Sequence, residues 1–289
     1  MSIYDSILNT GGKGMLANAL GRALGARAKS AVQIDRDVLD ITDPDAVAAA
    51  FERYRPTLVL NCAAYTAVDK AEAEEESAAA VNGKAVGILA SECRKHGAKL
   101  VHYSTDFVFD GKSDRPYRPG DRPDPQSAYG RTKLLGEQMA GADSLLIRTA
   151  WLYGPGGACF PRTMVELARQ KKPLTVVSDQ IGSPTFTFDL AEATLRLVDC
   201  DAKGIYHVVN NGTVSWFAFT QAILEEFDEH TQLSPITSAE WKKARPNSAT
   251  RPAYSVLDVS AYENLTGYRM RPWRQALRDY RLAVAQGGF

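Results

Sequence analysis

Residues 10–20 read TGGKGMLANAL and stand between a short apolar run, Ile3–Thr10, and a segment with apolar residues at helical spacing. Gly11, Gly14 and Ala17 occupy the three small-residue positions of a dinucleotide-binding loop. Small residues there permit a tight turn, close approach of the backbone to a pyrophosphate, and helix–strand packing. The free N–H groups at a helix N-terminus also favour bound phosphate. The stretch therefore predicts a strand–loop–helix unit that binds a dinucleotide.

Short apolar runs alternate with helical patterns from this unit onward. The runs that we expect to be buried strands are 31–34, 57–64, 99–105 and 145–151, with 204–210 returning to the same sheet. Their alternation with helices predicts an α/β protein with a Rossmann-type, doubly wound parallel sheet. After Trp151 the sequence becomes rich in Gly and Pro, which indicates a smaller, interleaved C-terminal substrate domain. We expect the dinucleotide domain to comprise 1–153 plus about 186–212, and the substrate domain 154–185 plus 213–289.

Composition excludes several classes of function. The 34 basic residues balance the 34 acidic ones, so no basic face for nucleic acid is indicated. The cysteines are scattered singly, at positions 62, 93, 159 and 200, without the spacing of a metal site. No apolar run approaches the length of a membrane span, and the first residues do not resemble a secretory signal. We therefore expect a cytoplasmic protein without a metal site.

Two charged residues stand where the adenosine ribose of a dinucleotide is usually recognised, about 20 residues after the glycine loop. Asp35 is suited to the ribose hydroxyls of NAD(H), and Arg36 to the 2′-phosphate of NADP(H). The sequence leaves both cofactors open.

A tyrosine and a lysine lie four positions apart in SAYGRTKLLGE, residues 127–137. On a helix, Tyr129 and Lys133 would share one face, and the ammonium would lower the pKa of the phenol. Thr105 ends a predicted strand, at the sheet edge where open α/β folds bind ligands. The three side chains could place an acid against a carbonyl while a nicotinamide delivers hydride to its carbon.

Six segments extend this pattern over nearly the whole chain. They are NCAAYTAVDKAE (61–72), VHYSTDFVFDG (101–111), SAYGRTKLLGE (127–137), IRTAWLYG (147–154), VSDQIGSPTFTFDLA (177–191) and RPAYSVLD (251–258). With them the chain resembles the extended short-chain dehydrogenase/reductases, and within these the dTDP-4-dehydrorhamnose reductase family. The resemblance implies NAD(P)H-dependent reduction of the C4 keto group of dTDP-4-dehydro-L-rhamnose to dTDP-L-rhamnose.

The resemblance also implies roles for individual residues. Tyr129 would be the proton donor, Lys133 would lower its pKa and bind the nicotinamide ribose, and Thr105 would assist at the substrate oxygen. The residues implied to contact the cofactor, besides Asp35 and Arg36, are Gly11, Gly14, Met15, Leu16, Asp40, Ile41, Ala63, Ala64, Tyr65, Thr66, Tyr129 and Lys133. Those implied to contact the sugar nucleotide are Val68, Thr105, Asp106, Trp151 and Arg251.

Two polar residues near these motifs are ambiguous. Asn82 could relay protons through water, as an asparagine does in related enzymes, or simply lie on a solvated helix face. His102 lies on an apolar strand and is expected to be a satisfied core residue.

Other functions remain compatible with the sequence. One is another NAD(P)-dependent sugar-nucleotide reductase or an epimerase, and one is a non-catalytic regulatory subunit like the methionine adenosyltransferase β subunit. A 4,6-dehydratase is disfavoured, because Phe107 stands where those enzymes carry a glutamate and the resembling reductases a tyrosine. The acidic run Glu74–Glu76 could bind a divalent cation between subunits of a homodimer, but no ligand motif supports this.

Overall fold

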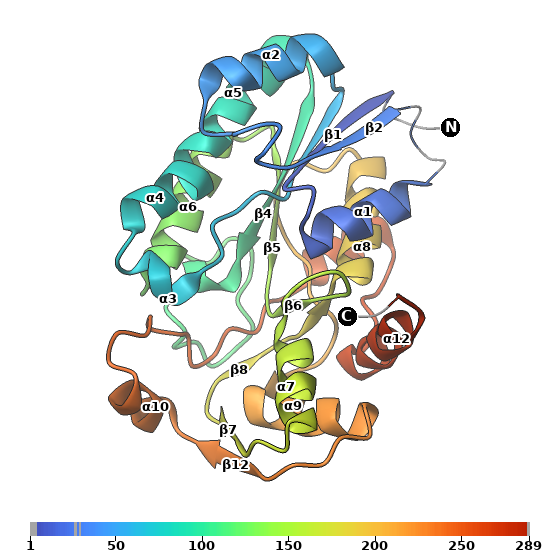
Figure 1. Cartoon of the computed structure of the whole chain (residues 1–289). Helices are drawn as coiled ribbons and strands as arrows, with labels where there is room; N and C mark the ends of the chain where they lie inside the picture. Colours follow the sequence, from blue (N-terminus) through green and yellow to red (C-terminus); the bar gives the residue numbers. More distant parts are fainter. Residues whose placement is uncertain (1–4, 26–27, 29, 288–289) are drawn as a thin grey trace.

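A six-stranded parallel sheet forms the centre of the computed structural model, which describes residues 5–25, 28 and 30–287 (Figure 1). Its strands are β1 (Ser6–Thr10), β2 (Ser30–Ile34), β3 (Leu58–Asn61), β4 (Lys99–Thr105), β5 (Leu145–Thr149) and β10 (Gly204–His207). They lie in the order β10-β5-β4-β3-β1-β2. The chain changes direction across the sheet between β1 and β3, which is where open parallel sheets bind ligands.

Helices cover both faces of this sheet, as the alternating pattern predicts (Figure 1). One face packs on α1 (Met15–Leu24), α8 (Thr187–Asp199) and α11 (Ser260–Thr266). The other packs on α2 (Pro44–Tyr54), α5 (Ala85–His96) and α6 (Ala128–Ala140). Alternate residues of one strand enter the two cores, since Ile7 joins the first cluster and Leu8 the second. The doubly wound fold is therefore confirmed.

Local sequence explains where these elements begin and end. The Asp43 side chain accepts hydrogen bonds from the backbone N–H groups of Asp45 and Ala46, and Pro44 opens α2, where a proline costs no helical hydrogen bond. The predicted strands are confirmed in place but end earlier than expected, with β3 ending at Asn61 and β5 at Thr149. The first two residues expected in β1 lie outside the described residues.

Small paired strands and aromatic residues make up much of the second half of the chain. The pairs are β6 (Leu152–Tyr153) with β9 (Thr185–Phe186), β7 (Leu174–Val177) with β12 (Leu233–Ile236), and β8 (Ile181–Gly182) with β11 (Val214–Ser215). The helices are α7 (Phe160–Arg169), α9 (Trp216–Glu226), α10 (Ser238–Ala244) and α12 (Trp273–Gly287). Buried residues of β7, α7, α9 and α12 form a separate hydrophobic cluster around Phe219 and Tyr280.

Short turns occupy the connections near the carboxyl edge of the sheet. They are α3 (Val68–Ala71), α4 (Glu75–Ala79), the π-helical turn η2 (Ala80–Lys84) and the 3-10 turn η3 (Asp106–Val108). Among the described residues, no helix combines the length and apolarity that a bilayer span requires.

Candidate active site

The glycine loop lies at the switch point of the sheet, against the loop that follows β3. Gly11 has φ +66°, and a Cβ added there would lie 2.7 Å from the backbone nitrogen of Ala63. Only glycine combines this left-handed conformation with so close an approach. Gly14 then caps α1, and its N–H donates to the carbonyl of Gly11 over 2.9 Å. The strand–loop–helix unit predicted from TGGKGMLANAL is therefore present.

Both charged residues predicted near the adenosine ribose lie beside this loop. The Asp35 carboxylate accepts from the backbone N–H of Arg36 over 2.6 Å and from that of Lys13 over 2.7 Å. These two backbone hydrogen bonds lower the pKa of Asp35, so the side chain is an ionised acceptor. The exposed Arg36 guanidinium lies 3.4 Å from the Asp40 carboxylate. A carboxylate and a guanidinium thus stand together at the end of β2.

The two residues predicted near the adenine are partly committed to local structure. Asp40 accepts hydrogen bonds from the backbone N–H and the hydroxyl of Thr42. Ile41 is buried in the hydrophobic cluster under α2. A contact between Ile41 and an adenine would therefore involve its backbone.

The loop 63–66, predicted to line the cofactor, is shaped by a buried asparagine. Asn82 Oδ1 accepts from the Tyr65 N–H over 2.9 Å, and Asn82 Nδ2 donates to the Tyr65 carbonyl over 3.1 Å. Asn82 is buried in the π-helical turn η2, an element often found at functional sites. It is thus neither solvated nor a free relay, because its amide holds the backbone of this loop. The Tyr65 hydroxyl donates to Glu74, and Glu75 pairs with Arg131.

The three predicted catalytic residues come from the end of β4 and the first two turns of α6. The Thr105 hydroxyl donates to Asp106 Oδ1 over 2.9 Å and accepts from the Phe107 N–H. Ser127 caps α6 by accepting from the Gly130 N–H, which places Tyr129 in the first turn. The Phe107 ring meets the Tyr129 ring edge-to-face, with 5.5 Å between centroids.

The charge environment of Tyr129 differs from the sequence prediction. Burial and the nearby Asp106 carboxylate raise the pKa of Tyr129 to about 12, against the opposing effect of the Thr105 hydroxyl. Lys133 does not compensate, because its ammonium is directed at the sheet. Lys133 Nζ donates to the Tyr103 carbonyl over 2.6 Å and lies 3.3 Å from His102 Nε2. The pKa of Tyr129 is thus raised, not lowered as predicted.

Asp106 is a buried carboxyl with little compensation. Its Oδ2 atom has no hydrogen-bond partner among the described residues, and burial raises its pKa to about 6. A buried charge without full pairing is costly. Ionisation of Asp106 therefore weakens the fold locally.

This burial predicts a pH-dependent gain in stability on replacing Asp106 with Asn. Because the folded protein holds the proton more tightly than the unfolded chain, where the pKa is near 3.8, wild-type stability falls as pH rises from about 4 to 6. Asp106→Asn lacks this loss. Its free energy of unfolding in urea should exceed that of the wild type by roughly 2–3 kcal/mol at pH 7.5, with the difference vanishing below about pH 4. A difference independent of pH would contradict this interpretation.

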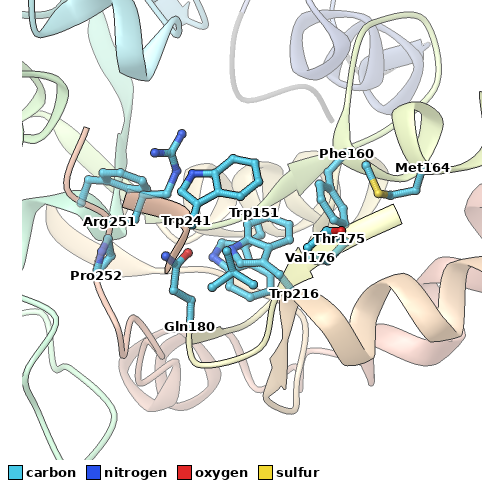
Figure 2. Close-up of a pocket in the computed structure, with 12 residues that line it drawn as sticks. Trp151, Phe160, Met164, Thr175, Val176, Gln180, Trp216, Trp241, Arg251 and Pro252 are labelled. Atoms are coloured by element: carbon cyan, nitrogen blue, oxygen red, sulfur yellow. The ribbon is translucent and has the colours of Figure 1, made fainter. Parts of the chain in front are cut away.

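An aromatic cavity of about 310 Å³ lies beside these residues (Figure 2). Its lining residues are Phe107, Trp151, Phe160, Met164, Thr175, Val176, Val177, Gln180, Trp216, Trp241, Arg251 and Pro252. The Trp151 and Trp216 rings stack with centroids 3.5 Å apart and planes 10° apart. Trp151 has φ +48°, an uncommon value for a bulky residue that often marks a functional site. The cavity thus offers flat apolar faces, with a guanidinium and an amide among them.

The sequence identified only part of this lining. Trp151 and Arg251, both predicted to contact the substrate, line the cavity, as does Phe107. Phe160, Trp216 and Trp241 were missed, because isolated aromatic residues in helices are usually core. Gln180 could have been found, since it belongs to the specific segment DQIGSPT.

Arg251 is already paired in the structure. Its NH1 lies 2.9 Å from Asp69 Oδ1 and its NH2 donates to Asp69 Oδ2 over 3.1 Å. Asp69 also accepts from the Ala249 N–H, so α3 is tied to the segment 249–252 at one side of the cavity. Val68, the other residue predicted here, is half-buried at the start of the same short helix.

A glycine loop at the switch point, followed by a threonine, a tyrosine and a lysine near the end of β4, defines a short-chain dehydrogenase/reductase. Comparison with known proteins narrows this class. The family model described as the RmlD substrate binding domain matches residues 5–285. The spore coat polysaccharide biosynthesis protein SpsK of Bacillus subtilis is 44% identical over 277 residues, covering 95% of this chain and 96% of that protein.

Two further relatives carry more specific names. The probable dTDP-4,6-dihydroxy-2-methyloxan-3-one 4-ketoreductase of Streptomyces antibioticus is 41% identical, covering 94% of this chain and 93% of that one. The crystal structure of dTDP-4-dehydrorhamnose reductase from Bacillus anthracis, in complex with NADP, matches with a TM-score of 0.91 and 33% identity, covering 96% and 99% of the two chains. The chain belongs to the dTDP-4-dehydrorhamnose reductase family of NAD(P)-dependent oxidoreductases.

Proposed function

We propose that this protein reduces the C4 keto group of dTDP-4-dehydro-L-rhamnose to give dTDP-L-rhamnose, with NADPH or NADH as the reductant. The observation that carries this proposal is the meeting of Thr105, Tyr129 and the glycine loop at one sheet edge, beside the aromatic cavity. The Bacillus anthracis relative is a dTDP-4-dehydrorhamnose reductase that binds NADP, which supports both the substrate and the cofactor.

The residues present fit a dinucleotide. The left-handed Gly11 leaves no room for a side chain, Gly14 presents the N-terminus of α1, and the ionised Asp35 is an acceptor suited to ribose hydroxyls. A bound reduced nicotinamide supplies the hydride for the keto carbon. Arg36, exposed beside Asp35, is placed to meet a 2′-phosphate.

Tyr129 is the proton donor in this proposal. Its raised pKa keeps the phenol protonated at neutral pH, so the proton is present before reaction. An alkoxide at C4 is much more basic than a phenolate, and it therefore takes this proton readily. The Thr105 hydroxyl orients the keto oxygen toward Tyr129, and the charged Lys133 stabilises the resulting phenolate from one helical turn away.

The nucleotide sugar would occupy the aromatic cavity. Flat apolar faces such as the Trp151–Trp216 pair suit a pyrimidine or a 6-deoxy sugar, and Arg251 suits a phosphate once released from Asp69. We assign these contacts to the interleaved domain 154–185 plus 213–289, and the dinucleotide to 1–153 plus about 186–212. Phe107, with no acidic proton, favours reduction over the water elimination of a dehydratase.

Turnover of purified protein with dTDP-4-dehydro-L-rhamnose and each reduced nicotinamide in turn tests the proposal. We expect the reduced-nicotinamide absorbance to fall by one equivalent per sugar reduced, and dTDP-glucose, which has no keto group, to leave it unchanged. Substrate conversion without net oxidation would indicate an epimerase. Binding of the dinucleotide without turnover of any dTDP-4-keto sugar would indicate a regulatory subunit.

A further inference from the structure

A row of buried polar side chains crosses the central sheet beneath the site. Thr10 on β1, Asn61 on β3 and His102 on β4 are register partners on adjacent strands, and their exposed fractions are 2%, 1% and 0%. The Thr10 hydroxyl donates to Asn61 Oδ1 over 2.7 Å, and Asn61 Nδ2 lies 3.1 Å from His102 Nδ1. The row begins at the residue that precedes Gly11 of the glycine loop.

The row ends on the predicted catalytic lysine. His102 Nε2 lies 3.3 Å from Lys133 Nζ, and both side chains are buried. Gly136 allows this contact, since a Cβ there would lie 2.1 Å from the Asn82 carbonyl oxygen and 3.2 Å from His102 Nε2. A glycine in α6 thus lets the helix approach β4 closely enough for Lys133 to reach the row.

The protonation of His102 follows from its surroundings. Burial and the positive charge of Lys133 hold the pKa of His102 well below its usual range, so the ring is neutral and has one donor and one acceptor nitrogen. A charged Lys133 can only donate, so Nε2 must accept and Nδ1 must carry the proton. Asn61 then presents its oxygen to the ring by turning its amide, and the Thr10 hydroxyl accepts as readily as it donates.

Other groups around Lys133 do not replace this contact. Burial lowers the pKa of Lys133 to about 8, and Glu137, one turn along α6, opposes the shift. Glu137 itself is bound to Arg148 and Ser104. Burial also raises the pKa of Cys62, so that thiol is neutral, as is Tyr129. The acceptors that the described residues offer at Lys133 Nζ are therefore His102 Nε2 and the Tyr103 carbonyl.

We propose that His102 is a positioning residue that fixes Lys133 in place and sets its affinity for a proton, with Asn61 and Thr10 holding the ring. For catalysis the inference rests on the proposed reduction, in which a charged Lys133 stabilises the phenolate of Tyr129. The buried row would then connect the glycine loop to the lysine of the proton-donating helix.

Two substitutions at His102 separate positioning from packing. A glutamine amide reaches the place of Nε2 and keeps the contact with Lys133, whereas an asparagine amide reaches the place of Nδ1 and keeps only the contact with Asn61. Both variants bury a neutral amide, and dinucleotide binding checks that each is folded. The titration of Lys133 can be followed by NMR in protein labelled with ¹³C-lysine and assigned through Lys133→Arg.

We expect His102→Asn to lower the pKa of Lys133 by about one unit, because the ammonium loses an acceptor, and His102→Gln to leave it near the wild-type value. The alkaline limb of the kcat profile should move to lower pH in His102→Asn only. In ¹⁵N-histidine-labelled wild-type protein, well below the pKa of Lys133, His102 should be the Nδ1–H tautomer; this measurement needs no variant.

Equal pKa values for Lys133 in both variants and the wild type would overturn the inference, as would an Nε2–H tautomer beside the charged lysine. The proposed function fails separately. A wild-type protein that reduces no dTDP-4-keto sugar, yet shows the shift of Lys133 in His102→Asn alone, would refute the reaction and keep the positioning role. Turnover with an unshifted lysine would do the reverse.

Discussion

Tyr129→Phe is expected to lower kcat for the proposed reduction by about 10²–10⁴-fold, the usual effect of removing a general acid. The ring remains, so its edge-to-face contact with Phe107 and the packing of α6 are preserved. Dinucleotide affinity, measured by quenching of tryptophan fluorescence, should stay close to that of the wild type. Tyr268→Phe is a matched control, because Tyr268 is exposed on the opposite side of the sheet from α6.

The outcome of this substitution separates chemistry from binding. A fall in kcat with unchanged dinucleotide affinity places the loss in the transition state. If Tyr129→Phe kept wild-type turnover, another group would supply the proton, and the roles assigned to Thr105 and Lys133 would lose their basis. The buried Asp106, whose pKa of about 6 lies near neutrality, would then be the next acid to test.

Arg148→Met is expected to lower the free energy of unfolding by roughly 3–5 kcal/mol, the usual cost of leaving one buried charge without its partner. The Arg148 and Glu137 side chains are 1% and 4% exposed and form a bidentate pair, with Nε–Oε1 at 2.8 Å and NH2–Oε2 at 2.7 Å. Ser104 donates to the same carboxylate. Urea unfolding at pH 7.5 measures the loss directly.

The double variant Arg148→Met/Glu137→Leu is the control for this prediction. Replacing both charges with apolar side chains removes the unpaired carboxylate, so most of the stability should return. The matched surface pair Lys203–Asp143 is exposed, and Lys203→Met should cost less than about 1 kcal/mol. A loss below about 1 kcal/mol in Arg148→Met would show that Glu137 becomes protonated or hydrated at little cost.

The fold was predictable because its signals are local. The glycine loop, the capping Asp43 and the apolar runs of the strands each occupy a few consecutive residues, and the structure contains the elements that they predict. The parallel order follows from the regular alternation of strands and helices. Strand ends were less accurate, because the residues after β3 and β5 continue apolar into the site.

The candidate site was predictable in its members but not in its contacts. Spacing alone placed Tyr129 and Lys133 on one helix, but the direction of the Lys133 side chain depends on His102 and the Tyr103 carbonyl, about 30 residues earlier. Likewise, nothing in the sequence near Arg251 reveals its pairing with Asp69, which is 182 residues away. Such contacts are set by packing between distant segments.

Deuterium transfer tests the central claim most directly. The wild-type protein would be incubated with dTDP-4-dehydro-L-rhamnose and reduced nicotinamide carrying deuterium at the transferred position, and the nucleotide sugar analysed by mass spectrometry and NMR. Direct reduction predicts one deuterium, at C4 of the sugar, with one cofactor oxidised per product. A sugar that changes without acquiring deuterium, or that is not reduced at all, would contradict it.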